Sequence, residues 1–134
     1  MTYSTRAMKP EDWAEVAPEF TPKEFRSPAR MGYEFMLWLL GVRRRAGVSM
    51  VISSSWRSKK QNTAAGGATD SAHMDEPLCE AVDVKPAGNE ARFRIVKAAM
   101  EEGCVRIGIY KNGSLHLDKT EGRRPAPRLW TVVK

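Results

Sequence analysis

A turn between two alternating segments is the sequence feature that most constrains the fold. Residues 105–110 and 114–118 alternate apolar and polar side chains, and Lys111, Asn112 and Gly113 separate them. An Asn-Gly pair tolerates the positive φ angles of a tight hairpin turn. The two segments are therefore predicted to pair as antiparallel strands.

The second predicted strand carries one of the chain's two histidines. Side chains alternate between the two faces of a strand, so Ser114, His116 and Asp118 are expected to share one face. A polar face of this kind within a hairpin indicates a functional site rather than part of the hydrophobic core.

The other histidine, His73, lies in a loop-like segment at residues 68–77, and Asp83 lies near the end of a predicted strand at 79–84. Imidazole and carboxylate groups are typical zinc ligands, and a catalytic zinc takes three protein groups and leaves a fourth position for water. His73, Asp83 and His116 would supply that set. A lone histidine is more commonly a hydrogen-bonding residue, so the spacing alone leaves both interpretations open.

The remaining segments predict helices and strands in one small α+β domain. The pattern Thr21-Pro22-Lys23-Glu24 is typical of a capping box, and the last predicted helix shows an apolar face of Phe93, Val96 and Met100. Helices are expected at residues 29–45, 59–65 and 90–102. Ser58 is expected to cap the helix at 59–65, and Asn89 the helix at 90–102. In addition to the strands above, strands are expected at 49–53 and 129–133.

Chain length favours a single domain. With 134 residues and 42% hydrophobic content, the chain suffices for one core and is too short for two. We expect an irregular lead-in at residues 1–19 that wraps the domain formed by residues 20–134.

The net charge of +6 and the pI of 9.6 suit an anionic partner such as nucleic acid, anionic lipid or an acidic wall polymer. Residues 43–45 form the single basic run, at a predicted helix end that itself favours cations. The aromatic-interleaved basic stripe of single-strand binders is absent, so nucleic acid is not the expected partner.

The two cysteines and the N-terminal residues indicate the cellular compartment in which the protein is made. Cys79 and Cys104 lack CxxC spacing, so reduced thiols are expected, although Cys79 is a rival zinc ligand. The first residues lack the apolar stretch of a signal peptide, and the apolar cluster at 35–41 is too short to cross a membrane. Synthesis in the cytoplasm without membrane insertion is therefore expected.

Several segments together resemble a known family. They are, in order, residues 20–25, residues 53–58, Asn62, Gly66-Gly67, residues 71–73, residues 81–83, residues 106–110, residues 116–118 and Trp130. In this order they resemble the zinc D-alanyl-D-alanine carboxypeptidases and related peptidoglycan endopeptidases, which share a fold with Hedgehog signalling domains. The resemblance implies a Hedgehog/DD-peptidase-like α+β fold, with a small antiparallel sheet and flanking helices.

The resemblance also implies an activity and a site. It makes His73, Asp83 and His116 the ligands of one zinc ion, and it implies hydrolysis of peptide bonds in peptidoglycan stem peptides or cross-links. Arg57 is expected to bind substrate, through a terminal carboxylate or the oxyanion of the intermediate, unless it forms a structural ion pair. Ser71 is expected to orient His73 or touch substrate, unless it is simply a turn residue before a loop histidine.

The chain departs from the family pattern in two places, the loop between His73 and Asp83 and the position of the general base. About three extra residues separate His73 from Asp83, and Cys79 replaces a glycine. Some relatives carry a general base three residues before the last histidine, where this chain has Gly113. Asp118 is the best substitute, either as the base or as a carboxylate that holds a ligand histidine. Further candidates on the loop are Asp70, Asp75, Glu76 and Glu80.

A small domain of this kind suits a phage or prophage product. It would act on the cell wall after release with a membrane-permeabilising partner, or as part of a virion together with phage structural proteins. The alternative is a non-hydrolytic zinc-binding module for wall binding or particle structure. A nucleic-acid-binding protein is the third interpretation, supported only by charge.

Overall fold

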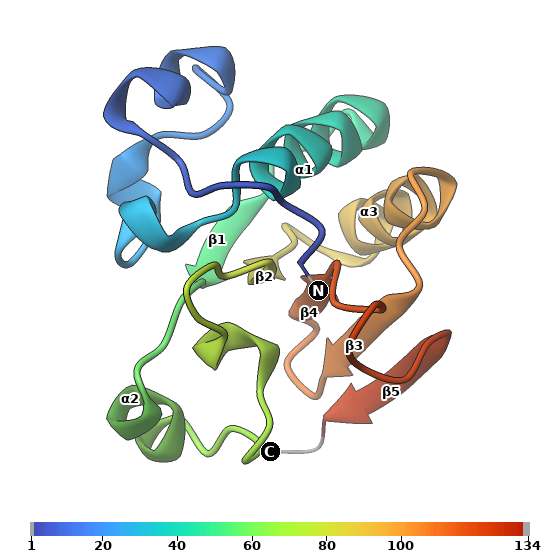
Figure 1. The fold of residues 1–134 in the computed structure, drawn as a ribbon. Coiled ribbons are helices and arrows are strands. Elements are labelled where there is room, and N and C mark those ends of the chain that lie inside the picture. Colours follow the sequence, from blue (N-terminus) through green and yellow to red (C-terminus); the bar gives the residue numbers. More distant parts are fainter. Residues whose placement is uncertain (1, 133–134) are drawn as a thin grey trace.

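The structure, a computed structural model, describes residues 2–132 and contains one five-stranded sheet with helices (Figure 1). The predicted α+β architecture is confirmed. The longer elements are α1 (Tyr33–Ala46), β1 (Val51–Ser54), α2 (Lys59–Ala64), β2 (Ala81–Lys85), α3 (Asn89–Glu101), β3 (Arg106–Tyr110), β4 (Leu115–Asp118) and β5 (Arg128–Val132). Four short 3₁₀ helices complete the set: η1 (Pro10–Glu15), η2 (Pro22–Glu24), η3 (Pro28–Arg30) and η4 (Ala72–Met74).

The sheet has the strand order β1-β2-β4-β3-β5. The predicted hairpin is present, because β3 and β4 pair antiparallel and Gly113 in their turn has a φ of 91°. The predicted C-terminal edge strand forms as β5, which runs parallel to β3 and makes the sheet mixed. The last residue predicted for that strand, Val133, lies outside the described residues.

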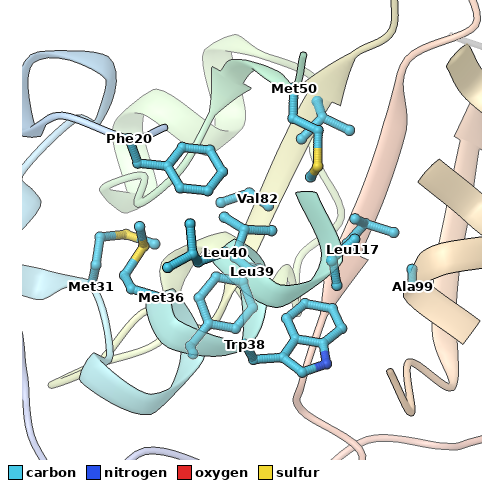
Figure 2. Packing of buried hydrophobic residues seen from close by; sticks show 14 of the residues in the cluster. Phe20, Met31, Met36, Trp38, Leu39, Leu40, Met50, Val82, Ala99 and Leu117 are labelled. Carbon is cyan, nitrogen blue, oxygen red and sulfur yellow. The ribbon is translucent and has the colours of Figure 1, made fainter. Parts of the chain in front are cut away.

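The two faces of the sheet differ in chemistry because side chains alternate along each strand. Val82 of β2 and Leu117 of β4 are fully buried, and Figure 2 shows them beside Leu39 and Leu40 of α1. Helices α1 and α3 lie on this apolar side in Figure 1 and contact one another. The next residues along the same strands, Asp83 and His116, consequently face the opposite side.

The N-terminal segment contributes side chains to the same core. Trp13 packs 5.3 Å from Phe25 between ring centroids, and Phe25 lies 6.0 Å from Phe20. The capping box forms, since the Thr21 backbone N–H donates to the Glu24 carboxylate at 2.7 Å, although it closes only one 3₁₀ turn. The segment before residue 20 is therefore packed against the domain.

The predicted apolar face of the last helix is wrong at Phe93 and Met100, whereas the third predicted residue, Val96, is half-buried and packs against the core. Phe93 and Met100 are 67% and 50% exposed, whereas Ile95, Ala98 and Ala99 are buried. Small alanine side chains permit a close approach between α3 and the rest of the core, so large residues on the other side of α3 stay in solvent. The helix also begins at Asn89, with Gly88 rather than Asn89 at the capping position.

None of the helices within residues 2–132 is long and apolar enough to cross a membrane.

Candidate metal centre

Three side chains converge on the polar side of the sheet. His73 comes from η4, while Asp83 and His116 are direct neighbours across β2 and β4. Asp83 Oδ1 lies 3.1 Å from both His73 Nε2 and His116 Nδ1, and those two nitrogens are 3.2 Å apart. All three residues are buried.

This spacing fits a tetrahedral zinc ion. Zinc lies about 2.0–2.1 Å from nitrogen and oxygen ligands, which places neighbouring ligand atoms of a tetrahedron about 3.3 Å apart. The distances of 3.1–3.2 Å among the three ligand atoms are close to that value. Two imidazoles and one carboxylate also form the donor set of a catalytic site, which keeps a fourth position open.

Hydrogen bonding fixes which nitrogen of His73 is available. Nδ1 lies 2.6 Å from the backbone carbonyl of Ser55, and a carbonyl only accepts, so Nδ1 carries the proton. Burial lowers the pKa of His73, which keeps the ring neutral and Nε2 unprotonated. The backbone N–H of Arg57 donates to the His73 carbonyl at 2.8 Å. The segment after β1 therefore presents Nε2 to the site.

The opposite nitrogen of His116 is available. Nε2 of His116 lies 2.6 Å from Asp118 Oδ2, which leaves Nδ1 facing Asp83. Burial would lower the pKa of His116, but its hydrogen bonds to Asp118 and Asp83 raise it to about 9. Without metal, Nδ1 therefore holds a proton at neutral pH and donates it to Asp83.

Asp83 presents one oxygen to the histidines and uses the other elsewhere. Its Oδ2 accepts hydrogen bonds from Arg57 Nη2 at 3.2 Å and from the Tyr110 hydroxyl at 2.9 Å. Burial opposes ionisation, but hydrogen bonds with the two histidines hold the pKa of Asp83 well below its usual range. The arrangement therefore favours a single metal-binding oxygen, Oδ1.

Asp118 lies behind His116 and is fully buried. Its Oδ1 accepts from Arg106 Nε at 2.9 Å and from the hydroxyl and backbone N–H of Thr120 at 2.7 and 3.0 Å. Burial would raise the pKa of Asp118, but the contacts with His116 and these donors hold it at about 2. Of the two predicted roles, the geometry favours a carboxylate that orients a ligand over a base that reaches substrate.

A groove of about 650 Å³ gives access to the centre. Arg57, Ser71, Tyr110 and Trp130 line it together with both histidines. Ser71 also caps η4, because its hydroxyl accepts from the His73 backbone N–H at 3.3 Å. The Trp130 ring lies 5.5 Å from the His116 ring, above Gly108, where a Cβ would come within 2.8 Å of the indole. A glycine is thus required for Trp130 to close this side of the groove.

The four loop acids lie in different surroundings. Only Asp70 lines the groove. Asp75 pairs with Arg123 and Arg124, Glu76 pairs with Arg30, and Glu80 is fully buried and accepts from the backbone of Tyr3 and Ser4. Gly113, at the position where some relatives carry a base, lies in the hairpin turn outside the groove lining.

Two residues that hold this site, Tyr110 and Asn62, belong to the segments of the family resemblance but had no predicted role. Tyr110 shares the polar face of β3 by strand alternation, which is a signal that could have identified it. Asn62 of α2 is buried, its Oδ1 accepts from Arg57 Nη1 at 3.3 Å, and its Nδ2 donates to the Ala68 carbonyl beyond α2 at 2.8 Å. Together with Asp83, Asn62 fixes the Arg57 guanidinium at the edge of the groove.

A comparison with protein families agrees with this geometry. The model of the family described as Peptidase M15 matches residues 15–118, a span that includes Arg57, the three converging side chains and Asp118. No curated protein matches the chain. Because the match covers well over half of the sequence, the chain belongs to the Peptidase M15 family, the zinc D-alanyl-D-alanine carboxypeptidase family.

Proposed function

We propose that this zinc peptidase holds one zinc ion and hydrolyses peptide bonds in peptidoglycan stem peptides or cross-links, as a carboxypeptidase or an endopeptidase. The observation that carries the proposal is the convergence of His73 Nε2, Asp83 Oδ1 and His116 Nδ1 at one groove, beside a fixed guanidinium.

Zinc bound here would polarise a scissile carbonyl and bring the pKa of its water toward about 7. Arg57 contributes a fixed positive charge at the groove edge, since its side chain is 13% exposed and bonded to Asp83 and Asn62. That charge suits a substrate carboxylate or the oxyanion of a tetrahedral intermediate. Burial and the neighbouring Asp83 raise the pKa of Tyr110, which keeps its hydroxyl a donor.

Asp70 is the loop acid with access to this groove. Its side chain is 87% exposed, with one contact to Arg124 Nη2 at 3.2 Å. Asp70→Asn is therefore the variant that tests for a carboxylate base. Turnover lost with zinc retained would assign that role, and unchanged turnover would exclude it.

Zinc content and digestion of purified peptidoglycan test the proposal. The protein should hold about one zinc per chain, and His116→Ala should remove it, whereas the exposed control Lys97→Ala should retain it. Digestion should release new free amine or D-alanine and should stop with chelator. Fragment masses would distinguish carboxypeptidase from endopeptidase cleavage. Full zinc occupancy in His116→Ala would contradict the ligand assignment.

A non-hydrolytic zinc-binding module is the second candidate. The burial of Asp118 and the glycine at position 113 favour it, because neither position offers an acid to the groove. Such a protein would retain zinc and sediment with peptidoglycan, yet release neither amine nor D-alanine from any wall preparation.

The predicted setting as a phage lysin or virion component, with a membrane-permeabilising partner or phage structural proteins, stays a prediction. Mass spectrometry of purified particles would distinguish a virion component from a free lysin.

A further inference from the structure

A second groove lies on the other side of Arg57 and Ala65, which line both grooves. It has a volume of about 800 Å³. One wall is strand β1 and the residues that follow it, another is residues 23–26, and the third is α2. We refer to it as the β1 groove.

The wall formed by β1 is a free sheet edge. Strand β1 ends the strand order and pairs only with β2, and no other segment within residues 2–132 forms a ladder with it. A sheet edge presents unpaired backbone N–H and C=O groups, and an extended peptide can bind there as an added strand. The four residues of β1 span about 13 Å, enough for three or four residues of a bound peptide.

The charge of the β1 groove favours an acidic peptide. Lys23, Arg26 and Arg57 line it, against one acid, Glu24. The Glu24 carboxylate already accepts from the backbone N–H and hydroxyl of Thr21 at 2.7 and 3.2 Å. The side chains of Lys23 and Arg26 are exposed and form no ion pair with an acid of the described chain. Two cations thus remain available to carboxylates beside an open sheet edge.

We propose that the β1 groove binds an extended, carboxylate-bearing part of the peptide substrate as an added strand along β1. The scissile bond of the same substrate lies in the metal groove across Arg57. This inference rests on the proposed peptidase function and adds a second subsite to it. It makes Lys23 and Arg26 determinants of substrate length and charge.

Two peptides that share one scissile bond test the subsite, one short and one extended by residues with free carboxylates. The zinc-loaded protein should show a kcat/KM on the order of tenfold higher for the extended peptide, the effect of two partly exposed ion pairs. This ratio should fall toward one in the double variant Lys23→Glu/Arg26→Glu, after amidation of the carboxylates, and at high salt.

The double variant Lys60→Glu/Lys97→Glu is the matched control. It makes the same change in net charge at two exposed lysines that line neither groove, and its ratio should equal that of the unmodified protein. The proposed subsite would be contradicted if the kcat/KM ratio of the extended to the short peptide fell equally in both double variants. It would also be contradicted if Lys23→Glu/Arg26→Glu left this ratio unchanged. Peptidase action on the short peptide would still stand in either case. Absence of turnover for both peptides with zinc bound would instead contradict the proposed function.

Amide chemical shifts provide a measurement that does not depend on turnover. Titration of the metal-free protein with the extended peptide should shift the backbone amides of residues 52–54 and 24–26 and leave α3 unchanged. Shifts confined to the metal groove would overturn the proposal. So would edge-to-edge pairing of β1 in a dimer that forms without peptide, detected by light scattering and by line broadening at residues 52–54.

Discussion

The strand that carries His116 and the loop that carries His73 hold their imidazoles by different means. His116 lies in β4, between β2 and β3, and every residue of β4 is buried. Backbone ladders on both sides fix its position, and Asp118 two residues later fixes its ring. This half of the site is therefore built into the centre of the sheet.

His73 lies in a three-residue 3₁₀ turn without a strand partner. Its carbonyl and Nδ1 bond to the segment after β1, and Arg124 spans the loop around it. Arg124 donates to the Asp70 carbonyl at 3.3 Å and to both carboxylate oxygens of Asp75 at 2.8 Å, on either side of His73.

One metal centre therefore depends on two kinds of structural support. Sheet pairing and a fully buried carboxylate hold His116, whereas side-chain ion pairs from the C-terminal segment hold the loop of His73. Changes to each support should accordingly differ in the size of their effect on stability and on metal affinity.

The largest effect is expected for Asp118→Asn. The substitution removes the charge that orients His116 and leaves the Arg106 guanidinium without its buried partner. Metal affinity should fall about 10–100-fold, and the free energy of unfolding should fall by about 3 kcal/mol. Chelator competition and urea denaturation measure the two effects. The exposed control Glu90→Gln on α3 should change neither, and an affinity of Asp118→Asn within twofold of the original would refute the orienting role.

The pH dependence of the metal-free protein should distinguish the two histidines. Folding raises the pKa of His116 from 6.5 to about 9, so its bound proton stabilises the fold fully below pH 6.5. That contribution, up to about 3 kcal/mol, is lost as the pH rises through 9. The pKa of His73 is lowered, so His73 is neutral in both states above pH 7 and adds nothing there.

Urea midpoints measured with chelator between about pH 6.5 and 8 should therefore decrease, because the buried thiols of Cys79 and Cys104, whose pKa values are raised by burial, contribute mainly above this range. Zinc-loaded protein should show the opposite trend, because the metal replaces the proton on His116 Nδ1 and binds more tightly as the pH rises. A metal-free midpoint that increases over this range would contradict the proton assignment.

A smaller effect is expected for Arg124→Lys on the loop side. Lysine keeps the charge but loses the paired contacts to Asp75. We expect a loss of about 1–2 kcal/mol and a several-fold loss of metal affinity. Arg30→Lys is the matched control, because the Arg30–Glu76 pair joins the same loop but is exposed and should contribute less than about 0.5 kcal/mol. Equal effects of the two variants would show that Arg124 does not position His73.

The smallest effect is expected for Ser71→Ala, which removes the cap of η4. Stability should fall by about 0.5 kcal/mol, with a slight loss of metal affinity. Ser58→Ala removes the equivalent cap of α2 and should cost similar stability without any change in metal affinity. Equal metal affinities in the two variants would contradict this prediction, because they would show that the Ser71 cap does not contribute to metal binding.

The sequence predicted local features and the ligands better than long-range ones. Ser58 and the Asn-Gly turn act within a few residues, so their roles follow from local backbone chemistry. His73, Asp83 and His116 came from strand alternation and family resemblance, and the structure brings them together.

Other features depend on contacts between distant segments, which local patterns do not encode. Arg124 meets Asp75 across 49 positions, and β5 pairs with β3 in parallel. The predicted face of α3 was wrong at Phe93 and Met100 because helical periodicity favoured large residues, whereas packing favours Ala98 and Ala99.

The extra residues between His73 and Asp83 lie in a loop that is held by side-chain ion pairs. Asp75 is held by Arg123 and Arg124, Arg123 also pairs with Glu80, and β2 begins at Ala81. The distance along the chain between the two ligands is thus uncoupled from their distance in space. Residues 76 and 77, which follow Asp75 and are exposed, form a natural position for grafting longer peptides, and such chimaeras would gain new rim contacts while keeping the metal-binding geometry.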